Sequence, residues 1–251
     1  MFLEISMRVK VIAALTVGLT SAMCMAGEEP LRFAASSAWA MPYGKFEADR
    51  LTGGILYDLA RALEKPLNLP VSIVVLPRKR IDGAVLAGDV DLRCYSNPQW
   101  TAVPGEHVWS KTIFELSDVI FGNASVADPK NLQGLMQGVG VSTVLGYDYQ
   151  SLNPLFTSGA LKRDDAVDQE KVLLKLSMGR TPYGVSDGLA LQWYIKNTPK
   201  HSLAAWRVTL SRNDFQCGVP KKGRIPAARI LAALDELKKS GKIDEILRNY
   251  R

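Results

Sequence analysis

Two segments that lie far apart in the chain share one pattern, and this pattern constrains the fold more than any other feature. In the first, a helix is expected to end at Gly88, a short strand follows, and the polar segment Tyr95-Ser96-Asn97-Pro98 comes next. In the second, Gly179 precedes a short strand at 183–186 and then Asp187. Ligands of open α/β sheets bind at the carboxyl ends of strands. Two such edges predict two α/β lobes that face each other across a cleft.

The first 26 residues have the pattern of a secretory signal peptide. Arg8 and Lys10 precede an apolar run at 11–19, and small residues lead to Ala26. The run is shorter than the roughly 20 residues that span a bilayer. Cys24 lacks the Leu three positions earlier that a lipoprotein site favours. We therefore expect a soluble protein exported to the periplasm, with residues 1–26 removed.

Composition describes a globular protein, with 47% apolar and 22% charged residues in 251. The formal net charge is +6, but Lys and Arg are scattered, with small clusters at 78–80 and 221–222. No long basic stripe alternates with aromatic residues, so nucleic acid is not an expected partner. The sequence contains no HExxH, CxxC or GxxxxGK[ST] motif, and no metal or cofactor is expected.

The spacing of apolar residues predicts strands that alternate with helices. The strands are expected at 31–36, 71–76, 90–94, 117–122, 139–142, 183–186, 207–210 and 215–219. The helices are expected at 55–63, 81–87, 169–178, 189–195, 227–237 and 243–250, with Pro66 and Pro70 ending the first of them. This alternation argues for an α/β fold with a mostly parallel sheet in each lobe.

Six segments, in order, resemble the bacterial extracellular solute-binding protein family 3, the periplasmic components of polar amino-acid importers. The resemblance covers about 31–250, and its segments are 51–58, 87–91, 109–114, 131–141, 178–187 and 237–250. It implies a type II periplasmic binding protein fold, in which two lobes close on the ligand and two crossing strands join them. The crossings would fall near 117–122 and 212–217. Lobe 1 would comprise 27–121 plus 214–251, and lobe 2 would comprise 122–213.

The implied topology places the returning strand beside the third strand of lobe 1, which makes Cys94 and Cys217 neighbours. These are the two cysteines that remain after export, in a compartment that permits disulfides. Either the two sulfurs are bonded, or the pair forms two buried small apolar side chains. Both outcomes remain open.

Asp187 is expected to contact an ammonium group of the ligand. It stands after Gly179-Arg180, where the resemblance places the ammonium-binding Asp of the family. A carboxylate in a partly dry cleft suits an amine, because a matched charged pair is strong there. The same side chain could instead cap the helix that begins near Leu189.

The carboxylate-binding Arg of the family has no counterpart, because its register falls near Val103. Arg93 and Arg78 are the candidate substitutes, and Arg80 is a weaker one. Arg93 lies within an apolar strand, so its charge needs a partner. That partner is either the ligand or a local carboxylate such as Asp91.

The remaining candidates come from loops at strand ends: Trp39, Tyr43, Tyr95, Ser96, Asn97, Trp100 and Thr143. The resemblance places Trp39 and Tyr43, in the first loop, against the ligand. It also places the loop after the third strand, with Tyr95, Ser96 and Asn97, in contact with the ligand. Trp100 either covers the cleft or simply packs against the rest of the protein. Thr143 precedes a helix whose N-terminal amides suit an anionic group.

These features predict a monomeric periplasmic protein that captures a small polar solute, an amino acid or a related amine or organic acid. Capture would occur by hinge closure, and a membrane permease of an ABC importer would receive the ligand. One alternative is an enzyme, since cyclohexadienyl dehydratases resemble this family. Catalysis needs a placed acid or base, and His107 and His201 are both expected in exposed loops, so an enzyme is not expected. The other alternative is a sensor that signals to a different membrane partner.

Overall fold

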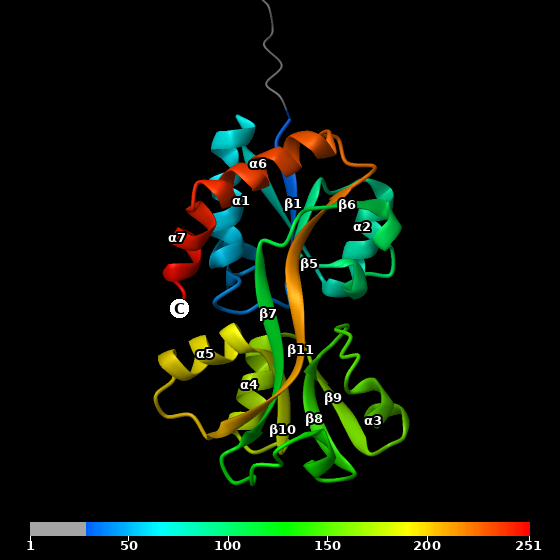
Figure 1. Ribbon diagram of the computed structural model, residues 1–251, viewed down its shortest axis with the longest axis vertical. Helices are drawn as coiled ribbons and strands as arrows, with labels where there is room; N and C mark the ends of the chain where they lie inside the picture. The colour runs from blue at the N-terminus through cyan, green and yellow to red at the C-terminus, as the bar shows by residue number, and fades with distance from the viewer. Residues whose placement is uncertain (1–28) are drawn as a thin grey trace, which may run out of the picture.

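The computed structural model describes residues 29–251, and the expected signal peptide at 1–26 lies outside them. Two α/β lobes stand one above the other, joined by the long strands β7 (Phe114–Asn123) and β11 (Leu203–Pro220) (Figure 1). The two strands are antiparallel, with Arg212 opposite Ser117. The predicted crossings at 117–122 and 212–217 lie within them. None of the helices in the described part of the chain has the length and apolarity needed to cross a membrane.

Lobe 1 is built on β1 (Leu31–Ser36), β4 (Val71–Leu76) and β5 (Leu92–Ser96), with β1 parallel to both neighbours. The crossing strand β11 runs antiparallel to β5 and to the short β6 (His107–Trp109). A separate hairpin joins β2 (Lys45–Glu47) to β3 (Arg50–Gly53). The helices are α1 (Ile55–Leu67), α2 (Ile81–Ala87), α6 (Ala227–Lys239) and α7 (Lys242–Arg248).

Lobe 2 is built on β10 (Tyr183–Asp187), β8 (Val139–Val144) and β9 (Leu161–Ala166), which run parallel to one another. The crossing strand β7 pairs antiparallel with β10. The helices are α3 (Asn153–Thr157), α4 (Gln169–Ser177) and α5 (Gly188–Asn197). The sheet order β4-β1-β5-β11-β7-β10-β8-β9 is thus continuous through the two crossing strands.

Alternation along the strands explains the layers. In β1, Phe33 and Ala35 pack in the main core with α1 and α6, whereas Ala34 packs in a second core with α2. In β7, Val119 and Phe121 pack with α4 and α5, while Ile120 joins the opposite core. Successive strand residues point to opposite faces, so each sheet is covered by helices on both sides (Figure 1).

Two sequence expectations need correction. Pro66 does not end α1 but lies inside it, and the helix ends one residue later at Leu67, before the left-handed Asn68 (φ 50°). Pro66 has no N–H, so the last turn of α1 lacks one hydrogen bond to the residue four positions earlier. The strands expected at 207–210 and 215–219 are one strand, β11, because the polar residues between them pair with β7 across the lobe junction.

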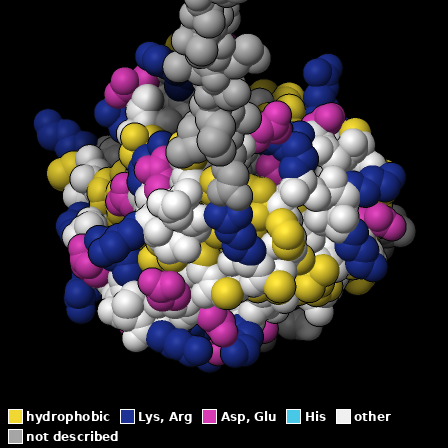
Figure 2. All heavy atoms as spheres, turned by 90° about the horizontal axis from the view of Figure 1, so that it is seen from above, with side chains coloured by type: hydrophobic (Ala, Val, Ile, Leu, Met, Phe, Trp, Pro, Cys, Tyr) yellow, Lys and Arg dark blue, Asp and Glu magenta, His cyan; other side chains and the backbone are white. Residues whose placement is uncertain are grey.

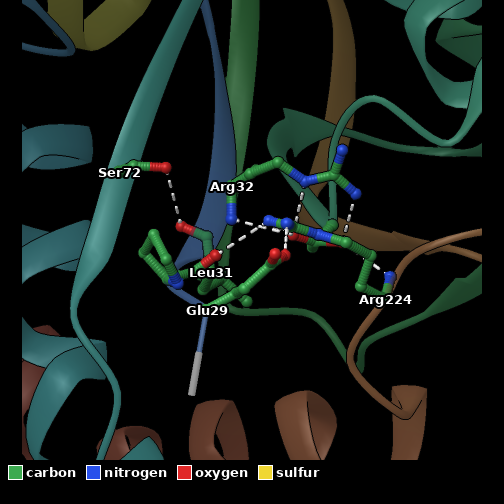
Figure 3. A network of polar contacts seen from close by, with 7 residues as sticks. Glu29, Leu31, Arg32, Ser72 and Arg224 are labelled. Atoms are coloured by element: carbon green, nitrogen blue, oxygen red, sulfur yellow. Dashed lines mark hydrogen bonds and ion pairs between the residues drawn. The ribbon is translucent and has the colours of Figure 1, made fainter. Parts of the chain in front are cut away.

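Two contacts fix β5 within lobe 1. Cys94 and Cys217 form a disulfide that joins β5 to β11, so the pairing that the sequence left open is made. At the other end of β5, Asp91 is fully buried and binds Arg32 and the backbone N–H of Arg224 (Figure 3). The carboxyl end of β5 is therefore held in place before any ligand arrives.

The surface of lobe 1 seen from above carries Lys and Arg interleaved with Asp and Glu (Figure 2). Positive side chains do not gather into a stripe on this face, which agrees with the scattered basic residues of the sequence.

Candidate functional site

A cavity lies between the two lobes beside the crossing strands. The lining residues are Ser36, Trp39, Arg78, Ile81, Arg93, Cys94, Tyr95 and Trp100 from lobe 1, Asp118 from β7, and Tyr147, Asp148 and Tyr149 from lobe 2. Most of them lie in the segments that follow β1, β4, β5 and β8 or at the ends of these strands. The carboxyl ends of parallel strands therefore converge on one space, as the sequence predicted.

Tyr95 forms the centre of an aromatic wall. Its ring stacks on Tyr43 (centroids 4.2 Å apart, planes at 18°) and lies 5.7 Å from Phe215. Trp100 meets it edge-on at 6.1 Å, and Trp39 lies 6.2 Å away. The backbone of Tyr95 is left-handed (φ 54°), which is uncommon for a bulky residue. Packing on several sides holds the ring in this orientation.

Arg93 is buried (3% exposed), and its Nη1 donates to Asp82 Oδ1 at 2.7 Å. Asp82, on α2, also accepts from Thr101 Oγ1 and from the backbone N–H of Ala102. Burial lowers the pKa of Arg93 to about 10. The local carboxylate that the sequence left open is thus Asp82 and not Asp91, because Asp91 is already bound to Arg32.

Arg78 is less committed. Its Nη1 stands 3.9 Å from Asp82 Oδ1, and its Nη2 donates to the carbonyl oxygen of Trp100. Arg78 lines the cavity, whereas Arg80 does not. Of the two arginines that line the cavity, Arg78 has more freedom to bind an anionic group.

Asp187 is buried (5% exposed) and realises the helix-capping alternative. Its Oδ1 accepts from the N–H groups of Leu189 (2.9 Å) and Ala190 (3.0 Å) at the start of α5. The hydroxyl of Tyr43, in lobe 1, donates to the same oxygen at 2.6 Å. Burial raises the pKa of Asp187 to about 6, against the effect of these hydrogen bonds. Asp187 is not among the cavity-lining residues.

Asp118 was missed by sequence reasoning. It lies on β7, directly opposite Asp187 in the strand register, and it lines the cavity. Its Oδ2 accepts from Ser211 Oγ (2.9 Å) and Asn213 Nδ2 (3.0 Å) on β11. Burial raises its pKa. One charged residue within the largely apolar run 116–121 was the signal that could have revealed it.

Tyr147 and Tyr149 were also missed, although they follow β8 by only a few residues. Burial raises the pKa of Tyr147 to about 12. The Tyr149 hydroxyl accepts from the N–H of Val144 at 3.1 Å, and the guanidinium of Arg163 lies 5.4 Å from its ring centre. Aromatic residues just beyond a strand's carboxyl end were the available signal.

Four expected residues lie behind the cavity wall. Tyr43 supports Tyr95, and Ser96 is buried. Asn97 caps a short turn by accepting from the N–H of Gln99 (2.9 Å). Thr143 donates to Asp165 on β9 at 2.8 Å. These contacts shape the wall, and a direct ligand contact by any of the four stays a prediction.

The histidines correct a further expectation. His107 is buried (5% exposed) on β6, with its ring 4.8 Å from that of Trp109, and its Nδ1 lies 3.1 Å from the carbonyl oxygen of Val103. His201 is half-buried, and its Nδ1 accepts from the N–H of Leu203. Neither lines the cavity. Within residues 29–251, no group of three or more His, Cys, Asp or Glu is arranged to hold a metal ion.

The two α/β lobes, the two crossing strands and the cavity between them define the two-lobed fold of periplasmic binding proteins. Comparisons of the sequence with family models and with curated proteins give no match. The structure is similar to an ancestral arginine-binding protein bound to arginine, with 22% identity, a TM-score of 0.74, and coverage of 88% of this chain and 97% of that one.

Two further solved structures are similar. The arginine-, lysine-, histidine-binding protein ArtJ from Geobacillus stearothermophilus is 18% identical, with a TM-score of 0.71 and coverage of 88% and 95%. An ancestral amino-acid-binding protein, a precursor of cyclohexadienyl dehydratase, is 18% identical, with a TM-score of 0.69 and coverage of 88% and 94%. At these identities the likeness establishes the fold.

Proposed function

We propose that this protein captures a small polar solute, an amino acid or a related amine or organic acid, by closing its lobes around it. The observation that carries the proposal is that both lobes and the crossing strand β7 line one cavity. A ligand in this cavity gains contacts to both lobes only when they are closed. It therefore binds the closed state more tightly and shifts the equilibrium toward it.

The chemistry of the lining supports this choice. Arg78 and Arg93 bring positive charge to the cavity, although Arg93 is already bound by Asp82, and Trp39, Tyr95 and Trp100 offer flat apolar surface. Ligand sites of this kind combine apolar walls with a few fixed polar groups. The similar structures include proteins described as binding arginine, lysine and histidine, which are small polar solutes of the proposed kind.

The proposal extends to cellular context. Residues 1–26 act as the signal peptide, and the mature chain works in the periplasm as a monomer. Lobe 1 consists of 27–121 and 214–251, and lobe 2 of 122–213. A membrane permease of an ABC importer receives the ligand. The similar structures include the substrate-binding protein of an amino-acid ABC transporter, which supports this role.

The test is a thermal-shift screen of refolded protein, since refolding removes bound solute. The panel holds polar amino acids, amines, small organic acids and prephenate. A ligand at 100 times its Kd stabilises the native state by about 2.7 kcal/mol and raises the Tm accordingly. A panel in which no compound raises the Tm would contradict the proposal.

One observation favours an enzyme as second candidate: one similar structure is a precursor of cyclohexadienyl dehydratase. Asp118 lines the cavity, and burial raises its pKa, as suits a general acid. A Tm shift by prephenate alone, together with its consumption followed by absorbance, would replace the binding function with this one.

A further inference from the structure

Asp118 and Asp187 form a pair of neighbouring carboxylates. They are opposite each other in the antiparallel β7–β10 register, so their Cβ atoms stand about 4.5–5.5 Å apart on one face of the sheet. Like charges placed opposite each other are destabilising, and a charge withdrawn from water needs a partner. Within residues 29–251, the polar contacts of both are neutral donors, with no Lys or Arg among them. A cation is what this pair lacks.

Only one of the two carboxylates can be reached from the cavity. Asp187 is 5% exposed, its Oδ1 already accepts three hydrogen bonds, one of them from Tyr43 of lobe 1, and its Oδ2 is buried without a hydrogen-bond partner in the described chain. Asp118 lines the cavity. Ser211 and Asn213 hold its Oδ2 and so fix the carboxylate plane, while its Oδ1 has no hydrogen-bond partner in the described chain. Each carboxylate therefore has one oxygen without a hydrogen-bond partner, but only Asp118 lines the cavity.

The surroundings of Asp118 also suit a cation. Five aromatic side chains line the same cavity: Trp39, Tyr95, Trp100, Tyr147 and Tyr149. Aromatic faces attract ammonium and guanidinium groups, most strongly where water is excluded. On the lobe 1 side, Arg78 is the less tightly held positive group, because its Nη1 stands 3.9 Å from Asp82 Oδ1 whereas that of Arg93 stands 2.7 Å from it. The cavity therefore has carboxylates at the crossing strand (Asp118) and in lobe 2 (Asp148), and its positive groups in lobe 1.

We propose that Asp118 is the residue that binds the cationic nitrogen of the ligand, and that Asp187 only positions Tyr43 and the start of α5. The ligand class is then an organic cation or zwitterion, with an ammonium or guanidinium group at Asp118 and any anionic group at Arg78. This inference rests on the proposed solute-binding function and narrows it.

The experiment measures binding of L-arginine, L-lysine and agmatine as cationic probes, and of glutarate and L-glutamate as anionic ones. Thermal shift and calorimetry are run on the full mature chain. The variants are Asp118→Asn, Asp118→Glu and Asp187→Asn. Asp214→Asn, an exposed Asp on β11 outside the cavity, is the matched control. Each variant is first compared with wild type for its Tm without a probe.

We expect a cationic probe to bind wild type and the Asp214→Asn control alike. Asp118→Asn should lose at least about tenfold in affinity, because a hydrogen bond to a charged group is removed. Asp118→Glu keeps the charge and should recover part of that loss, even if Asp118→Asn folds poorly. Asp187→Asn should lose less than about threefold, which is less than one neutral hydrogen bond contributes.

Other results separate the possible failures. If Asp187→Asn abolishes binding while Asp118→Asn keeps it, the assignment to Asp118 is wrong and the solute-binding function stands. If only glutarate or L-glutamate binds wild type, the cationic class is wrong and the solute-binding function again stands. If neither these probes nor the wider panel binds wild type, the solute-binding function itself fails.

Discussion

Asp91 and the Asp118–Asp187 pair are carboxylates withdrawn from water in the same molecule, and their environments are opposite. Asp91 is fully buried at the start of β5, where it accepts from Arg32 Nε (2.9 Å), Arg32 Nη2 (2.8 Å) and the N–H groups of Arg32 and Arg224 (Figure 3). Burial alone would raise its pKa, but these partners hold it below the ordinary value. For Asp118 and Asp187, burial prevails and the pKa is raised.

The difference distinguishes structure from function. A buried carboxylate with a full set of charged partners holds the fold together, and nothing remains for a ligand to supply. A carboxylate that is buried without a cation is costly in the empty protein, and strongly perturbed groups of this kind cluster at functional sites. Positively charged partners, rather than burial, separate Asp91 from the Asp118–Asp187 pair.

The largest expected effect is a loss of stability when Asp91 is removed. Asp91→Ala leaves two arginines near the N-terminal edge of the sheet without their carboxylate, and breaking a buried pair costs about 3–5 kcal/mol. We expect urea unfolding to show a loss of this size. Asp89→Ala, an exposed neighbour, should change stability by less than about 0.5 kcal/mol. If Asp91→Ala lowered the free energy of unfolding by less than about 1 kcal/mol, Asp91 would not be the structural carboxylate described above.

The stability contribution of Asp187 should change with pH in the opposite sense to that of Asp91, because the pKa of Asp187 is raised and that of Asp91 is lowered. The pKa of Asp187 rises from an ordinary 3.8 to about 6, so the native state binds the proton more tightly than the unfolded state. Its contribution to stability is then greatest at low pH and falls as pH rises through 6, by about 3 kcal/mol at 1.36 kcal/mol per pKa unit.

Urea unfolding of wild type and Asp187→Asn at pH 4 and pH 7.5 measures this. The stability of Asp187→Asn relative to wild type should improve on going to pH 7.5, because the variant carries no charge to bury. A difference between the two proteins that is independent of pH would mean that Asp187 titrates normally.

The disulfide links the two regions, since Cys94 lies three residues after Asp91 and also lines the cavity. It closes a sequence separation of 123 residues, and loss of such a bridge typically costs about 2–4 kcal/mol. We expect a reducing agent to lower the Tm of wild type and to leave the Cys94→Ser/Cys217→Ser double variant unchanged. A wild-type Tm unaffected by reduction, with two free thiols by mass labelling, would refute the bridge.

The smallest effect isolates one hydrogen bond. Tyr43→Phe removes a donor from Asp187, which should cost about 1 kcal/mol and raise the pKa of Asp187 further, because that bond lowers it. The pH-dependent step in unfolding should move upward. Tyr57→Phe removes a hydroxyl that has no hydrogen-bond partner in the described residues, and the step should stay in place. If the pH-dependent step in the unfolding of Tyr43→Phe stayed in place, the hydrogen bond from Tyr43 would not affect the pKa of Asp187.

Much of the fold could be predicted, because its elements carry local signals. The strands β1 and β4 and the helix α2 have the bounds that apolar spacing and glycine predict. The strand β9 was missed because its sequence, LKRDDA, is polar at the edge of the sheet. The polar middle of β11 was left out of the predicted strands because it has no apolar pattern, and pairing with β7 keeps it extended.

The candidate site was less predictable, because its pairings are not local. Arg93 meets Asp82 across 11 residues of chain, and Tyr43 meets Asp187 across 144. No spacing rule connects such residues. Asp118 became a candidate only when the strand register placed it opposite Asp187 and beside Ser211. The sequence named side chains at strand ends as candidates, but which of them face the cavity depends on packing.

The two crossings also set an order in which the molecule can be built. The C-terminal part of β11 pairs with β5 and β6 and so completes the sheet of lobe 1. All other strands and helices of lobe 2 are synthesised before it. The helices α6 and α7, which cover α1, come later still. The lobe that begins first is thus the last to be completed. Until then the part of α1 that α6 and α7 cover is exposed, and an incomplete lobe of this kind is prone to self-association.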